Sequence, residues 1–182
     1  MRLFFCVELA EEVKRALAEV ARVCRTALGD GSWVLPENYH LTVRFLGEVA
    51  EARLPQLLEA GKRAAAETQP FTLTLDLLGG FPEPRAARVL WVGSRAEPPE
   101  FQKLSWRVEE AVRALGFPPE KKGPVAHITL ARFKSPKDLR PLLARVVPNV
   151  PEAKLAELTL MRSELRPEGA KYTPLASWTF GG

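Results

Sequence analysis

Apolar and polar residues follow one another along the chain in patterns that predict strands and helices in turn. Dense apolar runs or strict alternation indicate strands, whereas apolar residues at helical spacing indicate helices. The expected strands are 2–9, 39–46, 71–78, 88–93, 125–133, 152–164 and 170–180. The expected helices are 10–28, 51–67, 98–115 and 136–146, and residues 79–84 are expected to form a turn or loop.

The order of these elements favours an α+β fold. Helices alternate with strands, yet several strands follow one another after short loops, which favours antiparallel pairing over a doubly wound parallel sheet. A length of 182 residues allows one large domain or two small lobes. A similar succession of helix, loop, strand, helix and strand surrounds two points about half a chain apart, which indicates two related lobes.

One short phrase occurs at both of these points, as His40–Val43 (His-Leu-Thr-Val) and His127–Leu130 (His-Ile-Thr-Leu). The protein has two histidines, and both lie in this phrase. In an extended strand, side chains i and i+2 share a face. Each phrase therefore predicts a strand with its His and Thr on one face and its two apolar residues packed on a core.

The repeated phrase is suited to proton transfer. Imidazole can act as acid or base near neutral pH. One neutral and one protonated ring would serve a phosphodiester displacement, while threonine hydroxyls and a cation hold the phosphoryl oxygens. A single strand histidine is more often structural, and threonine is a good strand former. The repetition favours the functional interpretation, provided that the fold brings the two rings together.

Metal and nucleotide chemistry have little support in the sequence. A zinc site needs about three or four His, Cys or carboxylate ligands. No further histidine exists, and Cys6 and Cys24 lie far from both motifs in the sequence. The chain has neither a Walker-type glycine loop nor a dinucleotide GxGxxG. We expect no metal and no cofactor.

Composition adds a modest basic bias. The net charge is +4, and arginine outnumbers lysine. Guanidinium groups suit phosphate because they bind it through a bidentate fork, although a solvated basic surface would give the same composition. The two cysteines lack CxxC spacing, which predicts reduced, buried thiols in a cytoplasmic protein. The first nine residues are too short for a signal peptide, and no apolar run approaches the ~20 residues that span a bilayer.

Longer stretches around the motifs resemble a known family. They are 33–47 around the first motif, 126–132 around the second, the strand 88–93, and the ending 163–169 with Tyr172. Together they resemble the two-histidine (2H) phosphoesterases, and within these the bacterial and archaeal RNA 2′,3′-cyclic phosphodiesterases, also called 2′-5′ RNA ligases. The resemblance covers nearly the whole chain.

The resemblance implies a fold and a set of roles. The fold would be one bilobal α+β domain, 1–182, with two antiparallel sheets flanking a central cleft, helices on the outer faces and pseudo-twofold related lobes. His40 would donate a proton to the leaving ribose oxygen, and His127 would accept one from water. Thr42, Thr129 and Arg132 would contact the phosphate.

The resemblance also implies a substrate. The enzyme would hydrolyse a terminal 2′,3′-cyclic phosphate of RNA to a 2′-phosphate, or join it to a 5′-hydroxyl without ATP. RNA ends would be its partner, with no membrane, no obligate protein partner and a monomeric state. Two alternatives remain open: a non-catalytic protein that binds RNA ends, and a phosphodiesterase of small cyclic nucleotides.

Strand alternation alone does not establish whether Arg132 and Arg44 point into the cleft. It places Arg132 on the face opposite to His127, unless the strand bulges or ends near Ala131 or the side chain reaches round the strand end. Arg44 shares the parity of His40, and both a cleft position and sheet packing remain open for it.

Other candidates for contacts with RNA are weaker. Lys121 and Lys122 could contact its backbone or simply form a solvated basic loop. Trp33, Phe5 and Phe45 could stack on a base or belong to the core.

Overall fold

The computed structural model describes residues 1–181. Its helices are α1 (Glu11–Leu28), α2 (Leu54–Ala66), α3 (Pro99–Ala114) and α4 (Arg140–Leu143). Its strands are β1 (Arg2–Glu8), β2 (Ser32–Trp33), β3 (His40–Glu48), β4 (Phe71–Leu73), β5 (Leu77–Phe81), β6 (Ala87–Gly93), β7 (His127–Lys137), β8 (Ala153–Leu155), β9 (Glu157–Arg166) and β10 (Gly169–Thr179). Over the described residues, no helix is both long enough and apolar enough to cross a bilayer.

Two four-stranded antiparallel sheets form the two lobes. Sheet A has the order β10-β9-β1-β3, and sheet B has the order β2-β7-β6-β5. In each sheet a motif strand pairs with the strand that precedes it across a long helix, β3 with β1 and β7 with β6. This arrangement confirms the predicted α+β class. Strands β4 and β8 form an additional two-stranded sheet that the sequence did not predict.

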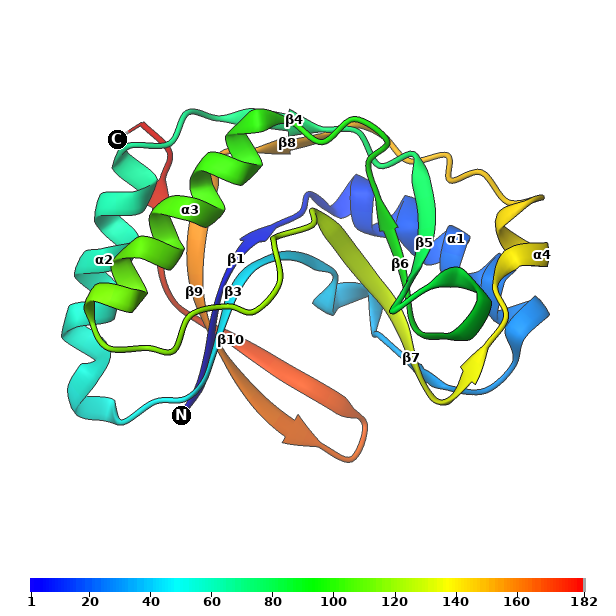
Figure 1. Cartoon of the computed structure of the whole chain (residues 1–182), viewed down its shortest axis with the longest axis horizontal. Helices are drawn as coiled ribbons and strands as arrows, with labels where there is room; N and C mark the ends of the chain where they lie inside the picture. The colour runs from blue at the N-terminus through cyan, green and yellow to red at the C-terminus, as the bar shows by residue number, and fades with distance from the viewer. Residues whose placement is uncertain (182) are drawn as a thin grey trace.

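Two long helices each follow a strand of one lobe and pack against the other lobe (Figure 1). Helix α1 follows β1 of sheet A, leads into β2 of sheet B, and packs near β7 of sheet B. Helix α3 connects two strands of sheet B, yet it packs against α2 and β3 on the side of sheet A. The two lobes are therefore interlocked by their own connections.

Strand β1 is buried on both faces, because sheet A is covered on both sides at this strand. Leu3, Phe5 and Val7 belong to the main core. Phe4 and Cys6 point the other way into a small second cluster. The apolar run at the start of the chain thus serves two different surfaces, only one of which is the main core.

The expected strand 71–78 is wrong as a single element. It divides into β4, which pairs with β8, and β5, which pairs with β6 in sheet B. The expected loop 79–84 is also wrong in its first half, because Gly79 and Gly80 lie within β5. Gly79 is opposite Trp91, and a Cβ atom added there would come within 2.4 Å of the indole ring. These glycines make room for neighbouring side chains and do not form a turn.

Two further predicted elements have different boundaries in the structure from those that the hydrophobic pattern predicts. Strand β7 continues through Pro136 to Lys137, so the helix expected over 136–146 is reduced to the four residues of α4. The strand expected over 152–164 is interrupted at Ala156, where β8 ends and β9 begins shortly afterwards in another sheet.

The contact between Gly79 and Trp91 yields a stability prediction. Trp91 is 8% exposed, and it lies against Gly79, Gly93 and the ring of Phe81, so it has little room to move. Gly79→Ala should reduce the free energy of unfolding by about 1–3 kcal/mol, as overpacking does in a filled core. Urea unfolding measures this change. Gly123→Ala is the control, because a Cβ there meets nothing within 4 Å, and equal loss in both variants would contradict the packing argument.

Candidate active site

The two motif strands bring their histidines and threonines to one cavity. It has a volume of about 570 Å³ and is lined by residues of both sheets. His40 and Thr42 enter it from β3, and His127 and Thr129 enter it from β7. Their apolar neighbours Leu41, Ile128 and Leu130 are fully buried behind them, as the alternation predicted. The structure therefore satisfies the geometric condition on which the acid–base hypothesis depends.

A β-bulge follows the threonine in each motif strand. In β7 the pairing with β6 moves from Thr129 to Ala131 in one step, which leaves Leu130 as an extra residue. In β3 the pairing with β1 moves from Thr42 to Arg44 in the same way. A bulge reverses the alternation of faces beyond it. The residue five positions after each histidine therefore lies on the histidine's own face.

The bulges determine on which face of its strand each of the two arginines, Arg132 and Arg44, lies. Arg132 lies five residues after His127 and lines the same cavity, so the bulge that the sequence left as one of two possibilities is present. Arg44 points away from this cavity, is 8% exposed, and donates from Nε to the Glu109 carboxylate at 2.6 Å. It is a buried, paired arginine of the sheet packing. Phe45 takes the position in β3 that corresponds to Arg132.

Both imidazoles are held by the same backbone contact. Nδ1 of His40 lies 2.8 Å from the Asn38 carbonyl oxygen, and Nδ1 of His127 lies 2.7 Å from that of Val125. A carbonyl only accepts, so Nδ1 carries the proton and Nε2 is the unprotonated nitrogen of each neutral ring. Nε2 of His40 accepts a hydrogen bond from the Thr42 hydroxyl at 2.8 Å. Nε2 is thus the atom of each ring left to exchange a proton with a substrate.

Aromatic rings surround each histidine. The ring of His40 lies 4.9 Å from Phe4 and 5.3 Å from Tyr172, centroid to centroid. The ring of His127 lies 5.0 Å from Phe81 and 6.0 Å from Trp91. These neighbours exclude water from the ring faces, so they favour the uncharged form of each imidazole.

Burial is the main cause of a lowered pKa at His40. It brings the pKa from 6.5 to about 4, although the hydrogen bond to the Asn38 carbonyl opposes the change. Positive charge on His127, Lys14 and Arg132 lowers the pKa further. A positive charge on His127, which lines the same cavity, therefore disfavours a positive charge on His40.

The pKa of His127 is also lowered, mainly by burial. The hydrogen bond to the Val125 carbonyl opposes this effect, and the Arg132 guanidinium adds to it. The Glu97 carboxylate raises the pKa of the same ring. Glu97 also accepts hydrogen bonds from the backbone N–H of Ala126 and the side chain of Gln102, so it holds the start of the motif strand in place.

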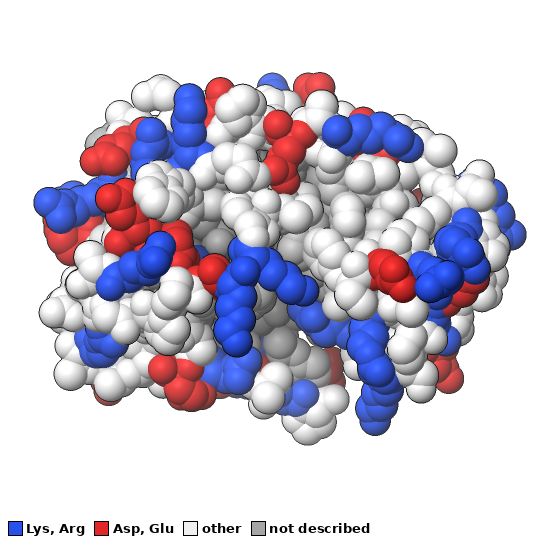
Figure 2. Space-filling model, in the orientation of Figure 1, with Lys and Arg blue, Asp and Glu red and all other residues white. Residues whose placement is uncertain are grey.

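The cavity contains cations that no carboxylate neutralises. Arg132 and Arg2 both line it and are exposed, and neither forms an ion pair with another described residue. Figure 2 shows lysine and arginine side chains gathered over the middle of one face, where Figure 1 places the loop between α3 and β7. The cavity therefore suits an anion.

Of the three aromatic residues considered for stacking on a base, one lies in the core and two line the cavity. Phe5 is fully buried in the main core, so it cannot stack on a ligand. Trp33 lines the cavity and donates from Nε1 to the Gly29 carbonyl at 3.0 Å. Phe45 is 52% exposed and also lines the cavity. Lys121 and Lys122 lie outside this cavity and line a neighbouring one.

Sequence reasoning missed several residues around the histidines. Phe4, Phe81 and Trp91 contact the rings, and Asn38 fixes the tautomer of His40. Arg2 contributes a cation. One signal was available: a first strand that is apolar on both faces predicts a second packing surface, and Phe4 lies on that surface.

No group of three or more His, Cys, Asp or Glu side chains converges as a metal site among residues 1–181. The chemistry that the described residues offer is proton transfer by two imidazoles, next to hydroxyl groups and guanidinium groups that can bind a phosphoryl group.

Comparisons with known proteins agree with this site. An RNA 2′,3′-cyclic phosphodiesterase of Thermus thermophilus is 37% identical over 199 residues, which cover 100% of this chain and 91% of the relative. The protein of the same name from Methanothermobacter thermautotrophicus is 31% identical over 180 residues, which cover 96% of each.

Solved structures show the same fold. The crystal structure of TT0787 of Thermus thermophilus has a TM-score of 0.83 and 35% identity, and covers 100% of this chain and 99% of that chain. E. coli LigT complexed with 3′-AMP has a TM-score of 0.80 and 28% identity, and covers 98% and 97%. The family described as LigT like Phosphoesterase matches residues 7–91 and, separately, residues 92–172. Each half of the chain thus carries the family pattern by itself, and the protein belongs to the LigT-like phosphoesterases.

Proposed function

We propose that this protein is an RNA 2′,3′-cyclic phosphodiesterase that hydrolyses a terminal cyclic phosphate to a 2′-phosphate. The observation that carries the proposal is that both motif histidines line one cavity together with two threonines and an unpaired arginine. Two relatives that align over nearly the whole chain carry this name. A structural neighbour was solved with 3′-AMP, a nucleotide with a phosphate on the ribose ring.

The reaction would be an in-line displacement at phosphorus. Water gives a proton to Nε2 of His127 as its oxygen bonds to phosphorus. The P–O3′ bond breaks on the opposite side, and Nε2 of His40 delivers a proton to O3′. The phosphate then remains on O2′. Thr42, Thr129 and Arg132 would hold the non-bridging oxygens, where charge develops in the transition state.

The protonation state of His40 depends on the substrate. With the cavity empty, its pKa of about 4 makes the ring neutral near pH 7. An anionic phosphate placed between the two motifs would raise the pKa of both rings, because it stabilises their charged forms. Substrate binding would thereby load the acid with its proton. Burial also makes that imidazolium a strong acid, ready to give the proton to O3′.

The two imidazoles supply both proton transfers, so the proposed reaction uses no metal ion and no nucleotide cofactor. We place the enzyme in the cytoplasm, because both cysteines are free and buried, as expected for a reducing compartment. We also propose that residues 1–182 act as one bilobal domain and as a monomer, because residues from both sheets complete the cavity.

The first test follows cleavage of an RNA oligonucleotide that ends in a 2′,3′-cyclic phosphate, in the presence of EDTA. Wild-type protein should produce a 2′-phosphate end at an undiminished rate. His40→Ala and His127→Ala should each lower the rate by ~10²–10⁴-fold, the usual contribution of general acid or base catalysis.

The outcomes separate the proposal from its alternatives. Binding of the oligonucleotide without turnover would indicate a non-catalytic RNA-end protein. Turnover confined to mononucleoside cyclic phosphates would indicate an enzyme of small cyclic nucleotides.

Thr129→Ala should cost ~1.5–3 kcal/mol of transition-state stabilisation, the value of a hydrogen bond to a charged group. Thr72→Ala, an exposed strand threonine away from the cavity, is its matched control.

The second test measures the proton that anion binding takes up. The folded pKa of His40 is about 4, below its ordinary 6.5, so the unfolded chain binds more protons between these values and stability falls as the pH is lowered through them. A bound anion would raise the pKa of His40 and would thereby reverse this loss of stability. Sulfate keeps its charge in this range, and its affinity should increase as the pH falls from about 7 toward about 5.

Titration calorimetry of sulfate in two buffers of different ionisation enthalpy measures the uptake directly. His40→Gln should take up fewer protons than the wild type, because one titrating ring is lost. Equal proton uptake in the wild type and the variant would contradict the assigned protonation of His40.

A further inference from the structure

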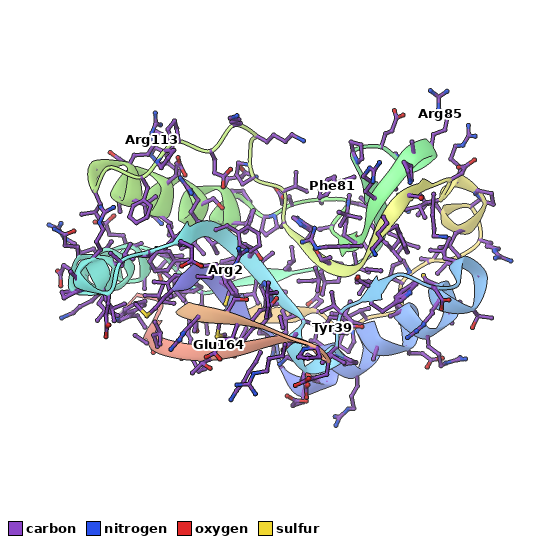
Figure 3. The ribbon with its side chains drawn as sticks, turned by 90° about the horizontal axis from the view of Figure 1, so that it is seen from below. Arg2, Tyr39, Phe81, Arg85, Arg113 and Glu164 are labelled. Carbon is purple, nitrogen blue, oxygen red and sulfur yellow. The ribbon has the colours of Figure 1, made fainter. Side chains whose placement is uncertain are left out.

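The outer part of the β9–β10 hairpin, residues 164–171, extends beyond the strand that supports it. Strand β1 pairs with β9 as far as Arg2 and Ser163, and from there β9 and β10 continue with each other as ladder partners. A bulge at Leu175 bends β10. In Figure 1 the hairpin leaves sheet A at an angle, and in Figure 3 its end lies beside the segment that carries Tyr39.

One side-chain hydrogen bond connects this outer hairpin to the first motif. Nδ2 of Asn38 donates to the backbone carbonyl oxygen of Ala170 at 2.7 Å, across 132 positions of sequence. In the described part of the chain it is the only hydrogen bond between residues 164–171 and a segment outside the hairpin. Leu35 adds an apolar contact, because a Cβ atom at Gly169 would lie 3.5 Å from its Cδ1. We call the hydrogen bond between Asn38 and Ala170 the latch.

The same asparagine also contacts His40. Its backbone carbonyl accepts from Nδ1 of the imidazole at 2.8 Å, while its side chain forms the latch. Asn38 is itself held in the 3₁₀ turn Pro36–Asn38, where the Glu37 carbonyl accepts from Nζ of Lys14 on α1 at 3.0 Å. The imidazole and the hairpin are therefore fastened to one short turn.

The latched hairpin covers the ring of His40. Tyr172 of β10 meets the imidazole edge to face, with the centroids 5.3 Å apart and the planes at 83°. Phe4 of β1 lies 4.9 Å from the same imidazole, and Tyr172 packs on Phe4 at 5.1 Å. Cys6 and Met161 complete this small apolar cluster. The imidazole is thus enclosed between side chains of β1 and β10.

The second motif gives an internal comparison. In both halves, the residue two places before the histidine supplies the carbonyl that holds Nδ1, Asn38 for His40 and Val125 for His127. The Val125 side chain is 43% exposed and has no polar group. A backbone carbonyl alone is therefore sufficient to bind the ring nitrogen. The amide side chain of Asn38 adds a contact that the second half lacks, and that contact is with the hairpin.

We propose that Asn38 is a positioning residue that fastens the β9–β10 hairpin over His40, so that Tyr172 covers the imidazole and keeps its Nε2 at the Thr42 hydroxyl. The proposal rests on the proposed function, in which this imidazole is the acid. Asn38 acts through Tyr172, and His40 alone of these groups gives a proton to the substrate. Such support keeps an acid within the narrow range of positions that proton transfer needs.

Opening the hairpin would change the burial of His40 and leave the charges around it in place. His127 and Arg132 on β7 and Lys14 on α1 all lower its pKa, and none of them belongs to the hairpin. Exposed Glu8 lies opposite His40 in the strand register. The apolar cluster contributes a phenol and a thiol, which are neutral near pH 7 because burial raises their pKa values. Loss of the cover would therefore raise the pKa of His40 toward 6.5.

NMR of the imidazole Hε1 protons measures this change without a substrate. The protein has two histidines, so two resonances titrate, and His127→Gln assigns them. Asn38→Ala keeps the backbone carbonyl and removes the latch. It should raise the proton affinity of His40 by ~10-fold or more, as loss of burial does, and leave that of His127 unchanged.

Glu37→Ala is the matched control. Glu37 lies in the same turn, and its exposed side chain has no hydrogen bond or ion pair with another described residue. Both histidines should titrate in this variant as they do in the wild type.

Variants of Tyr172 show whether Asn38 acts through the hairpin. Tyr172→Ala should raise the proton affinity of His40 as Asn38→Ala does, whereas Tyr172→Phe keeps the ring and should leave it unchanged. The double variant with both alanines should show no increase beyond the larger single effect, because both changes remove the same cover.

Hydrolysis of the cyclic-phosphate oligonucleotide gives the second measurement. With phosphate bound, the imidazole is already protonated, so Asn38→Ala loses the orientation and the acid strength of His40. It should lower kcat by ~10–100-fold, the scale of a misplaced reacting group. KM should change little, because Thr42, Thr129 and Arg132 lie on β3 and β7, outside the hairpin.

Three results would overturn the proposal: an unchanged pKa of His40 in Asn38→Ala, additive effects in the double variant, or a raised pKa with an unchanged kcat. If Asn38→Ala does not fold, equal pKa values of His40 in Tyr172→Ala and Tyr172→Phe would overturn it instead. A wild-type protein that shows the expected titrations and no hydrolysis would remove the proposed function and leave the latch.

Discussion

The interlocking of the two lobes is the constraint on which the site depends. The histidines stand on strands of different sheets, and no hydrogen-bonded ladder joins β3 to β7. Their relative position is set instead by side-chain packing, since α3 packs on β3 and α1 packs near β7. Each motif strand is thus held partly by a helix that follows a strand of the other lobe. Separating the lobes would expose the apolar faces of both helices, which stabilises the arrangement that an acid–base pair requires.

Burial and charge have opposite effects on the imidazoles, and the balance between them suits the chemistry. Aromatic neighbours and the nearby guanidinium of Arg132 favour neutral rings in the empty cavity. The same guanidinium attracts the anion whose charge favours protonation. A site built from cations and buried bases therefore has little tendency to be protonated until a phosphate is present. In the proposed reaction, the substrate and the proton on His40 would therefore arrive together, which would couple recognition to activation.

The part of this structure that follows from sequence is the part governed by local alternation. The pattern His-x-Thr-x predicted which side chains share a face, and Leu41, Ile128 and Leu130 are buried as expected. Alternation could not decide between a bulge at Leu130 and a side chain that reaches round the strand, because a bulge is stabilised by pairing with a strand distant in sequence.

Contacts distant in sequence also account for the other errors. Gly79 and Gly80 have the composition of a turn, and only the indole of Trp91 explains why they lie in a strand. The sequence could not predict that α1 and α3 cross between the lobes either. An amphipathic pattern identifies the apolar face of a helix without identifying the sheet that it covers. Phe4 and Phe5 are adjacent and chemically identical, yet one contacts a motif histidine and the other fills the core.

The two halves differ most clearly at one equivalent position. Both motif strands bulge after their threonine, and both present the residue five places after the histidine to the cleft. In the second half this residue is Arg132, which contributes positive charge to the cavity that the two histidines share. In the first half it is Phe45, which lies at the border of both cavities. A symmetric pair of arginines would bind phosphate from both sides and would leave no apolar surface for a base. The exchange of one cation for an aromatic ring gives the pseudo-symmetric cleft a direction, because one half can bind the phosphoryl oxygens more strongly while the other offers a stacking surface. Such a direction would distinguish an attacking group from a leaving group in a site whose two proposed acid–base residues are chemically the same.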